Sequence, residues 1–550
     1  ATQVQSSFDL SKGPLAKAVL YRLPDGDRLL VVIHHLLVDG VSWRILLEDL
    51  ETGYGQRQQG SAIAFADHTD SYLTWSEGLR QFAESDDLKT DAGFWQQEEA
   101  TAATDIPLEF DRAGVENLYR QTESVTVSLS EEETRTFLTQ PHRVYRAEAD
   151  TVLLTALGRS LRRWHGGDAT RILVEGHGRE PLGQNHDLTR TVGWFTSIYP
   201  VVLRSTCADD RQAMRETKEA LRRVPRRGVS YGVSRYLCAT PPAPSLHRPT
   251  LVFNYLGQFD TPSGGATTAE PVFSFAEESH GPVFGPEFQR QADLELTGIV
   301  SAQRLQLSVT YHPGLHGRAT VAAFLEDYRR ELLGLLDHCR GAAIAEKTPT
   351  DFTQCGLSLA EYDRFLTTTN WRPEDIDDWY PLSSMQAGLL YHDSLDQDSS
   401  AYFLQMSFAL QGPLDVGCFQ SAWEEVIERH AILRTAFVHD GLPVPVQVIL
   451  KHRPPDFLVE DIGSLPVAEQ DQRIGDFCAQ DVIRGFDLRD EPLVRFALFR
   501  LGSQRHQVIW SYHHILLDGW SLGNLYDEFH RLYGAHVTGS VARLPPVRQF

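Results

Sequence analysis

The sequence predicts an α/β protein that contains two related units. The first observation is a histidine-bearing stretch that occurs twice, at residues 34–42 and 513–521. In each copy an apolar run typical of a buried strand precedes the histidines, and a helical pattern follows them. The second observation is the length of 550 residues, which is too great for one hydrophobic core and favours about three to four packing units.

The repeated stretch reads HHLLVDGVS in the first copy and HHILLDGWS in the second. An Asp-Gly pair follows the second histidine at the same spacing in both copies, which indicates a tight turn before a helix. The similarity extends upstream, because FDL and PL at residues 8–10 and 14–15 match FDL and PL at residues 486–488 and 492–493. Two copies of one histidine-bearing domain are therefore the first hypothesis.

Periodicity and turn residues predict the other elements of the first half. The run at 122–130 alternates like a half-buried strand, and Ser130 with Glu133 forms a capping-box pattern that predicts the start of a helix. Further strands are expected at residues 29–33, 171–174, 201–203, 250–255, 291–300 and 304–311. Further helices are expected through residues 43–50, within 51–115, from 150 to 164, at 211–224 and at 321–339, and a loop rich in Gly, Pro and Ser is expected at 260–285.

The second half is expected to begin after a linker. Residues 341–375 show no sustained periodicity and are predicted to form this linker. A new domain is then expected over residues 376–550. Its predicted helices pass through residues 385–389 and lie at 415–430 and 467–485, and its predicted strands lie at 402–410, 433–438, 493–501 and 508–512.

The composition argues against several classes of protein. The formal net charge of -23 is spread along the chain, which disfavours binding to nucleic acid or to an anionic membrane surface. The six cysteines are dispersed without a CxxC pair, so we expect free thiols in a reducing cytosol and no metal site. We find no signal peptide and no apolar run that could span a bilayer, and a cytoplasmic protein is predicted. Because the sequence opens without Met inside a domain pattern, it is interpreted as an excerpt of a larger polypeptide.

Two ordered sets of motifs carry a resemblance to a known family. Residues 1–340 contain HHLLVDGVSW, DTVLLTALG, EGHGRE, TVGWFTSIYPV and FNYLGQFD, and residues 376–550 contain YPLSSMQAGLLYH, RHAILRTAF and HHILLDGWS. Together they resemble the condensation-domain superfamily of non-ribosomal peptide synthetases, relatives of chloramphenicol acetyltransferase. The first set resembles an epimerization domain that lacks its beginning, with an N-lobe at about 1–140 and a C-lobe at about 141–340. The second set resembles the truncated N-terminal lobe of a condensation domain that accepts a D-configured donor.

The resemblance implies a chloramphenicol-acetyltransferase-like, two-lobed α/β fold with a cleft where the lobes meet. It also implies Cα epimerization, from L to D, of an aminoacyl or peptidyl thioester, followed by peptide-bond formation in the condensation domain. The substrate would arrive on the phosphopantetheine arm of a carrier protein, and an adenylation domain would belong to the same assembly line for an antibiotic or other secondary metabolite. Neither a directly bound cofactor nor a metal is implied. Two alternatives stay open, namely tandem condensation or acyltransferase units and a carrier-docking module without catalysis.

Epimerization needs a base on one face of Cα, an acid on the other and donors for the developing enolate oxygen. His35 is, by resemblance, the histidine that faces the substrate, and an imidazole titrates near neutral pH. Glu175 follows a predicted strand in the EGHGRE turn, and burial in a partly dry cleft raises the pKa of such a carboxylate. His35 and Glu175 are therefore predicted to be the catalytic pair. Which of them deprotonates the L-isomer stays open.

The other candidates of the first half are predicted to surround this pair. His34 is interpreted as a structural histidine at the end of a strand. Asp39, followed by Gly40 in the turn, is predicted to be a structural carboxylate that pairs with an arginine. Three further residues either position the substrate or enolate or support the site from behind, and both roles stay open: Arg179, Asn254 and Tyr255.

In the second copy, peptide-bond formation needs an acceptor amine that is aligned with a thioester carbonyl. By resemblance His514 fills the catalytic role, as a base or as a positioning group, and His513 is its structural neighbour. Asp518 is predicted to be structural, and Gly519 to supply a backbone N–H. No counterpart of EGHGRE follows, and residues 376–550 alone are not expected to condense substrates.

Overall fold

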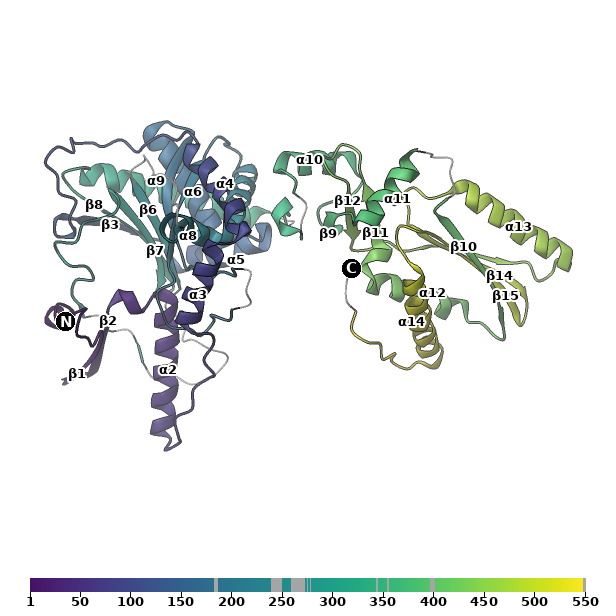
Figure 1. Cartoon of the computed structure of the whole chain (residues 1–550), viewed down its shortest axis with the longest axis horizontal. Helices are drawn as coiled ribbons and strands as arrows, with labels where there is room; N and C mark the ends of the chain where they lie inside the picture. Colours follow the sequence, from purple (N-terminus) through teal and green to yellow (C-terminus); the bar gives the residue numbers. More distant parts are fainter. Residues whose placement is uncertain are drawn as a thin grey trace. The chain divides into compact units, whose positions relative to one another are not determined.

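The structure is a computed structural model that describes residues 1–182, 186–238, 250–258, 273–274, 276, 278–342, 345–353, 356–395 and 401–547. The chain divides into two compact units, the first unit Ala1–Ala345 and the second unit Glu346–Phe550 (Figure 1). The last two residues of the FNYLGQFD motif, Phe259 and Asp260, lie outside the described residues, as does most of the loop expected at 260–285.

The first unit is built around a six-stranded mixed sheet with the order β3-β8-β7-β6-β4-β5. Its strands are β3 (Glu123–Ser128), β4 (Ala169–Gly176), β5 (Ser197–Arg204), β6 (Leu251–Gln258), β7 (Leu294–Ser301) and β8 (Arg304–Tyr311). β4 is parallel to β6 and β6 to β7, whereas the other neighbouring pairs are antiparallel. All six strands were predicted from the sequence, although β4 and β5 are longer than expected.

Helices cover one face of this sheet and form the main core of the first unit with it. They are α5 (Glu131–Tyr145), α6 (Ala149–His165), α7 (Asp210–Arg222) and α9 (Arg318–Gly341). Ile172 and Val174 of β4 are buried in this core together with Phe253 of β6. Because side chains alternate along a strand, Glu175 and Asn254, which are paired in register, lie on the opposite face of the sheet.

The start of α5 confirms one prediction and corrects another. The predicted capping box is present, because Ser130 Oγ accepts a hydrogen bond from the N–H of Glu133 and the Glu133 carboxylate accepts one from the N–H of Ser130. The lobe boundary expected near residue 140 is wrong, because it falls inside α5 and because β3, upstream of it, pairs with β8. Local patterns identified the strand and the helix, but the partner strand lies far along the chain.

The first histidine motif follows a two-stranded hairpin. β1 (Ala16–Leu23) and β2 (Gly26–Ile33) are antiparallel, and β2 leads through a 3₁₀ turn at His35–Leu37 into α2 (Gly40–Gln58). The strand predicted at 29–33 is confirmed as part of β2. β1 was not predicted, because AKAVLYRL mixes charged and apolar residues without a clear period.

The described residues of the first unit form four more helices: α1 (Thr2–Gln5), α3 (Tyr72–Ala83), α4 (Asp86–Ala100) and α8 (Val229–Tyr236). α8 contacts α3, α4 and the edge strand β5. Trp75 and Trp95, which lie in the segment 51–115 where helices were expected, are both buried. Helices α3, α4 and α8 therefore cover the β5 edge of the sheet.

The second unit contains a four-stranded sheet with the order β10-β15-β14-β13 and a three-stranded sheet with the order β11-β12-β9. The strands are β9 (Ile376–Pro381), β10 (Phe403–Gln411), β11 (Thr435–Val438), β12 (Val446–Leu450), β13 (Asp456–Asp461), β14 (Val494–Gly502) and β15 (Arg505–His513). The helices that follow residue 380 are α11 (Ser384–Leu395), α12 (Val416–Arg429), α13 (Val467–Arg484) and α14 (Gly519–Thr538). β9, β12 and β13 were not predicted. Trp423 and Trp510 lie at the centre of the core that α12 and α14 form with β14 and β15.

The structure corrects the prediction that residues 341–375 form a linker. Its second half forms helix α10 (Leu359–Thr368), whose Tyr362 and Phe365 are buried. Their rings lie 5.3 and 5.0 Å from the ring of Trp379 in β9. This stretch therefore belongs to a core of the second unit. A helix of this length offers too few apolar positions for a periodic signal.

Three general features hold for the described part of the chain. No helix there is both long enough and apolar enough to cross a bilayer. No group of three or more His, Cys, Asp or Glu side chains is arranged there to hold a metal ion. The described cysteines are free thiols.

Candidate active site

The two histidines of the first motif have different surroundings. His34 is half-buried, and its Nδ1 accepts a hydrogen bond from the backbone N–H of Leu36 at 3.2 Å, which fixes the ring within the turn. His35 is exposed, and its ring meets that of Trp194 edge-on, with 5.2 Å between the centroids. The imidazole of His35 is therefore the one that remains accessible from the protein surface.

Glu175 lies near the end of β4 on the sheet face opposite the core helices. Asn254 of β6 is its partner in the parallel register and forms a hydrogen bond with its carboxylate. Burial raises the pKa of Glu175, while the charge of a protonated His35 and the hydrogen bond from Asn254 lower it less. His35 and Glu175 thus lie close enough for their charges to interact. The structure brings the predicted pair together with Asn254.

Tyr255, the neighbour of Asn254, does not join this group. Its ring packs edge-on against Phe137 of α5, with 5.9 Å between the centroids, at the main core of the first unit. Burial, followed by the charge of Asp150, raises the pKa of Tyr255 to about 12, so its phenol stays neutral near pH 7. Side-chain alternation along β6 places Asn254 and Tyr255 on opposite faces of the sheet.

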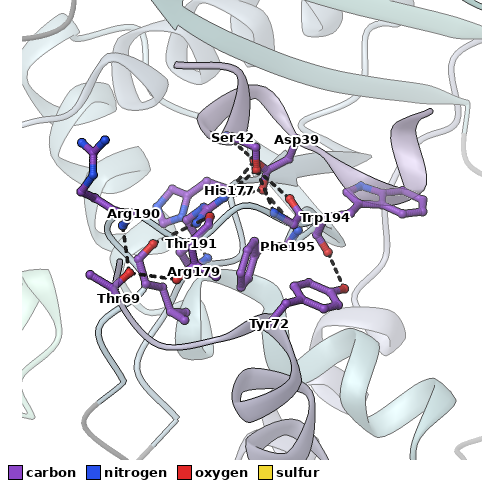
Figure 2. Close-up of polar contacts among 12 residues, drawn as sticks. Asp39, Ser42, Thr69, Tyr72, His177, Arg179, Arg190, Thr191, Trp194 and Phe195 are labelled. Carbon is purple, nitrogen blue, oxygen red and sulfur yellow. Dashed lines mark hydrogen bonds and ion pairs between the residues drawn. The ribbon is translucent and has the colours of Figure 1, made fainter. Parts of the chain in front are cut away.

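Asp39 has the arginine partner that the sequence predicted. Arg179 Nη2 lies 3.0 Å from Asp39 Oδ1 and 3.2 Å from Oδ2, and both side chains are buried. Asp39 also accepts hydrogen bonds from the N–H of Ser42, at 2.7 Å, and of Phe195, at 3.2 Å. Figure 2 shows the Asp39 carboxylate among these donors. Gly40 begins α2, and Asp39 is its N-cap.

The remaining contacts of Arg179 favour the supporting role over the substrate-positioning role. Its Nη1 donates to the backbone carbonyls of Leu188 and Thr191 at 2.9 and 2.7 Å, and its guanidinium lies 4.0 Å from the ring centre of Phe195. Arg179 is thereby surrounded by protein groups. Its guanidinium joins the EGHGRE turn to residues 188–195 and to the start of α2.

Glycine is required at one position of this turn. Gly178 has φ +68°, and a Cβ atom there would lie 1.7 Å from the carbonyl oxygen of Phe195. Only a residue without a side chain fits that approach. The close contact holds the chain after Glu175 against the segment that carries Trp194.

Sequence reasoning missed several residues that support the site. Ser42 Oγ donates to the carbonyl of Gly193 at 2.9 Å and accepts from its N–H at 3.1 Å. Tyr72 donates to the carbonyl of Trp194 at 2.8 Å (Figure 2). Ser42 had a signal, because it stands three residues after the N-cap Asp39, where a second polar side chain often joins the cap. Tyr72 had none, since it lies on a separate helix.

Glu295 of β7 is a further acidic residue that the sequence did not single out. Its carboxylate accepts hydrogen bonds from Tyr119 Oη at 3.1 Å and from Arg290 Nε at 3.1 Å. Its charge adds to the rise in the pKa of Glu175. Burial and the charge of Glu295 also raise the pKa of Tyr119, so this phenol stays protonated and keeps donating.

The second histidine motif repeats the local geometry of the first. His513 Nδ1 accepts from the N–H of Ile515 at 3.2 Å, as His34 does from Leu36. Asp518 Oδ1 accepts from the N–H and Oγ of Ser521 at 2.8 and 2.7 Å, and Gly519 begins α14. His514 is exposed, and its Nδ1 lies 2.8 Å from the carbonyl oxygen of Leu517.

The two motifs differ in what lies around the aspartate. Asp39 is buried beneath the EGHGRE turn, whereas Asp518 is exposed. Within the described residues of the second unit, no arginine pairs with Asp518. The structure therefore places the predicted residues His513, His514, Asp518 and Gly519 together in one turn.

Comparisons with known proteins show the family to which the chain belongs. Residues 1–357 and 376–550 match the family model described as "Condensation domain". The chain is 36% identical over 540 residues to a protein of the linear gramicidin synthase of Brevibacillus parabrevis and 36% identical over 547 residues to a protein of the mycosubtilin synthase of Bacillus subtilis. These matches cover 97% and 98% of the chain but only 7% and 20% of the two relatives.

Among solved structures, the chain is similar to the epimerization domain from the third module of tyrocidine synthetase B. The TM-score is 0.57 and the sequence identity 37%. The match covers 62% of this chain and 76% of that domain.

Proposed function

Because the chain belongs to the condensation-domain family, we propose that its first unit is an epimerization domain of a non-ribosomal peptide synthetase. Its reaction is the inversion of Cα, from L to D, in an aminoacyl or peptidyl thioester on the phosphopantetheine arm of a carrier protein. The observation that carries the proposal is the placement of Glu175, with its raised pKa, within electrostatic reach of His35. The similarity to a solved epimerization domain supports it.

The chemistry follows from these two groups. One of them takes the Cα proton, and the electron pair of the C–H bond moves into an enolate on the thioester oxygen. The other returns a proton to the opposite face, which restores the thioester with inverted configuration. A carboxyl group whose pKa is raised toward neutrality and an imidazole are both suited to give and take a proton at physiological pH.

Asn254 and the Asp39–Arg179 pair have positioning roles in this proposal. Asn254 holds the carboxylate of Glu175 by a hydrogen bond from the neighbouring strand. The Asp39–Arg179 ion pair fixes the turn that follows Glu175 against the helix that follows His35. His34 and Gly40 shape the turn between β2 and that helix.

For the second unit we propose the role of a condensation-domain lobe downstream of the epimerase. The observation that favours it is the repeat of the histidine turn, in which His514 is exposed and Asp518 caps the following helix. His514 would align or deprotonate the acceptor amine, with Asp518 and Gly519 in support. Carrier domains on either side and an adenylation domain are the partners that this proposal requires.

A carrier-docking module without catalysis is the alternative, and the arginine-rich stretch at 222–227 is where an acidic carrier protein could bind. Arg226 and Arg227 are however engaged within the first unit, by Asp87 at 2.8 Å and by Glu148 at 2.5 and 2.7 Å. Tandem condensation or acyltransferase units are the other alternative. They would have no use for the carboxylate of Glu175 opposite His35.

Incubation of the protein with an L-aminoacyl carrier protein in D2O tests the proposal. We expect deuterium to enter Cα and the D-isomer to form, as measured by mass spectrometry and chiral chromatography after hydrolysis of the thioester. Amide formation without exchange at Cα would favour tandem condensation units. Carrier binding without either reaction would favour the docking module.

A further inference from the structure

A cavity of about 730 Å³ lies on the face of the sheet that carries Glu175. Leu173 of β4 and Ile198 of β5 form part of its floor. Leu173 precedes Glu175 by two residues along β4, and Ile198 of β5 is the antiparallel partner of Glu175. Both side chains therefore lie on the same face of the sheet as Glu175. Two residues that line the cavity therefore neighbour Glu175 on the same face of the sheet.

A further lining residue contacts His35. Trp194 lines the cavity, and its ring lies 5.2 Å from the ring of His35. A substrate whose Cα atom lies between His35 and Glu175 would therefore lie next to this cavity of the first unit. Its volume falls within the range of about 300–1,000 Å³ that is common for small-molecule sites.

The walls next to Glu175 are mainly apolar. Trp75 and Leu79 of α3 line one side, and Val229 and Val233 of α8 line another. In each helix the two residues are four positions apart and therefore lie on one face. Trp75, Val229 and Val233 are also members of one buried apolar cluster. These four side chains present mainly hydrocarbon surface, and the polar lining residues of the neighbouring segment, Thr196 and Ser197, carry no charge.

Three of the charged lining residues, Arg171, Arg235 and Glu99, are engaged with other protein groups. Arg171 is four residues before Glu175 along β4, roughly 13 Å away at the rise of a strand. Its Nη2 donates to the backbone carbonyls of Glu99 and Thr101 at 3.0 and 2.6 Å. Arg235 lies 3.6 Å from Glu99, which also accepts from Tyr231 Oη at 3.0 Å.

From these observations we infer that the cavity receives the side chain of the residue whose Cα is inverted and selects a large apolar or aromatic one. The inference rests on the proposed epimerase function, since it assumes that Cα lies between His35 and Glu175. Burial of a large apolar side chain against Leu173, Trp75 and Val233 would stabilise such a substrate relative to a small one.

Gly232 provides a direct test. It lines the cavity from α8, and a Cβ atom built on it would have no other atom within 4 Å. Gly232→Leu therefore adds a side chain toward the cavity without a backbone clash, and glycine is itself unfavourable inside a helix. Gly334 of α9 is a matched control, because it is an exposed helical glycine with the same open surroundings.

The experiment compares L-phenylalanyl and L-alanyl thioesters on a carrier protein, with incorporation of solvent deuterium at Cα as the readout. We expect the wild-type protein to prefer the phenylalanyl substrate in kcat/KM. Gly232→Leu should lower that preference at least tenfold while exchange of the alanyl substrate persists, and Gly334→Leu should leave both unchanged. If Gly232→Leu keeps the wild-type preference for the phenylalanyl substrate and still exchanges deuterium, the inference about the cavity is wrong, but the proposed epimerase function still stands. Absence of exchange from both substrates in the wild-type protein would overturn the proposed function, and the inference with it.

Discussion

Arg179 binds Asp39 at 3.0 Å and thereby fastens the turn after Glu175 to the turn after His35. The two side chains are only 7% and 4% exposed, so little water screens the pair. Neither residue needs to touch a substrate for this contact to matter. The contact holds together the two segments from which the proposed acid and base extend.

Asp39→Ala is expected to destabilise the first unit by about 3–5 kcal/mol, because it leaves the buried guanidinium of Arg179 without its counter-charge. Urea unfolding of the whole chain, followed by the fluorescence of its tryptophans, measures this. The transition of the first unit should move to a lower urea concentration. Lys89→Ala is the matched control, since it removes an ion pair with Asp86 whose side chains are 76% and 93% exposed. The control should have little effect on stability, because water and salt screen such an exposed pair. Equal effects of the two substitutions would contradict the role given to the Asp39–Arg179 pair.

Glu175→Gln is expected to stabilise the first unit near neutral pH while it strongly lowers activity. Burial raises the pKa of Glu175 in the folded state, so its charged form costs folding free energy that a neutral amide does not. Below the ordinary glutamate pKa of about 4.3 the carboxyl is protonated in both states and the wild-type protein incurs no such loss. The gain in Tm of the variant should therefore appear as the pH rises through the folded-state pKa.

Thermal unfolding at a series of pH values measures this gain. Exposed Glu84→Gln serves as the control and should show no comparable dependence on pH. A Glu175→Gln variant that is less stable than the wild-type protein near neutral pH would count against a buried, raised-pKa carboxylate.

Gly178→Ala is expected to displace the turn after Glu175 and to lower the rate of epimerization strongly. Its Cβ would meet the carbonyl oxygen of Phe195 at 1.7 Å, in addition to the strain of φ +68°. Gly166→Ala isolates the strain, because Gly166 has φ +77° with no other atom within 4 Å of a Cβ. The control should cost about 1–2 kcal/mol and keep its activity. Similar losses of activity in both variants would show that the close approach at Gly178 is unimportant.

Phe365→Ala is expected to destabilise the second unit by about 3–5 kcal/mol, since Phe365 is buried against Trp379. Hydrogen exchange measured by mass spectrometry should show protected amides over Leu359–Thr368 in the wild-type protein and faster exchange there in the variant. Arg364→Ala, at an exposed position of the same helix, should change little. Amides of the wild-type helix that exchange as fast as those of an unfolded chain would restore the linker interpretation.

Local structure was largely predictable from the sequence because it depends on neighbouring residues. The repeat predicted one turn geometry in two places, and His34 and His513 indeed accept the same backbone hydrogen bond. Asp39 and Asp518 likewise each cap a helix through a serine three residues later. Such contacts span few residues, so a short motif determines them.

Contacts between distant segments were predictable in kind but not in identity. An arginine partner was expected for Asp39, yet only the fold shows that it is Arg179, from a turn far along the chain. Asn254 and Tyr255 were treated alike, because the register of β6 against β4 decides which of them faces Glu175. Helix α10 was missed because its signal depends on Trp379, which lies outside the helix.

The rate of deuterium incorporation at Cα in Glu175→Gln and His35→Ala, measured separately from L- and D-aminoacyl carrier substrates, tests most directly whether these two residues exchange the proton. Asn254→Ala reports on the positioning of Glu175, and carrier binding is measured in parallel. We predict that each of the first two variants loses about 10²- to 10⁴-fold of the exchange rate while carrier binding is retained. Wild-type exchange in Glu175→Gln from both substrates would contradict the assignment of this carboxylate as half of the catalytic pair.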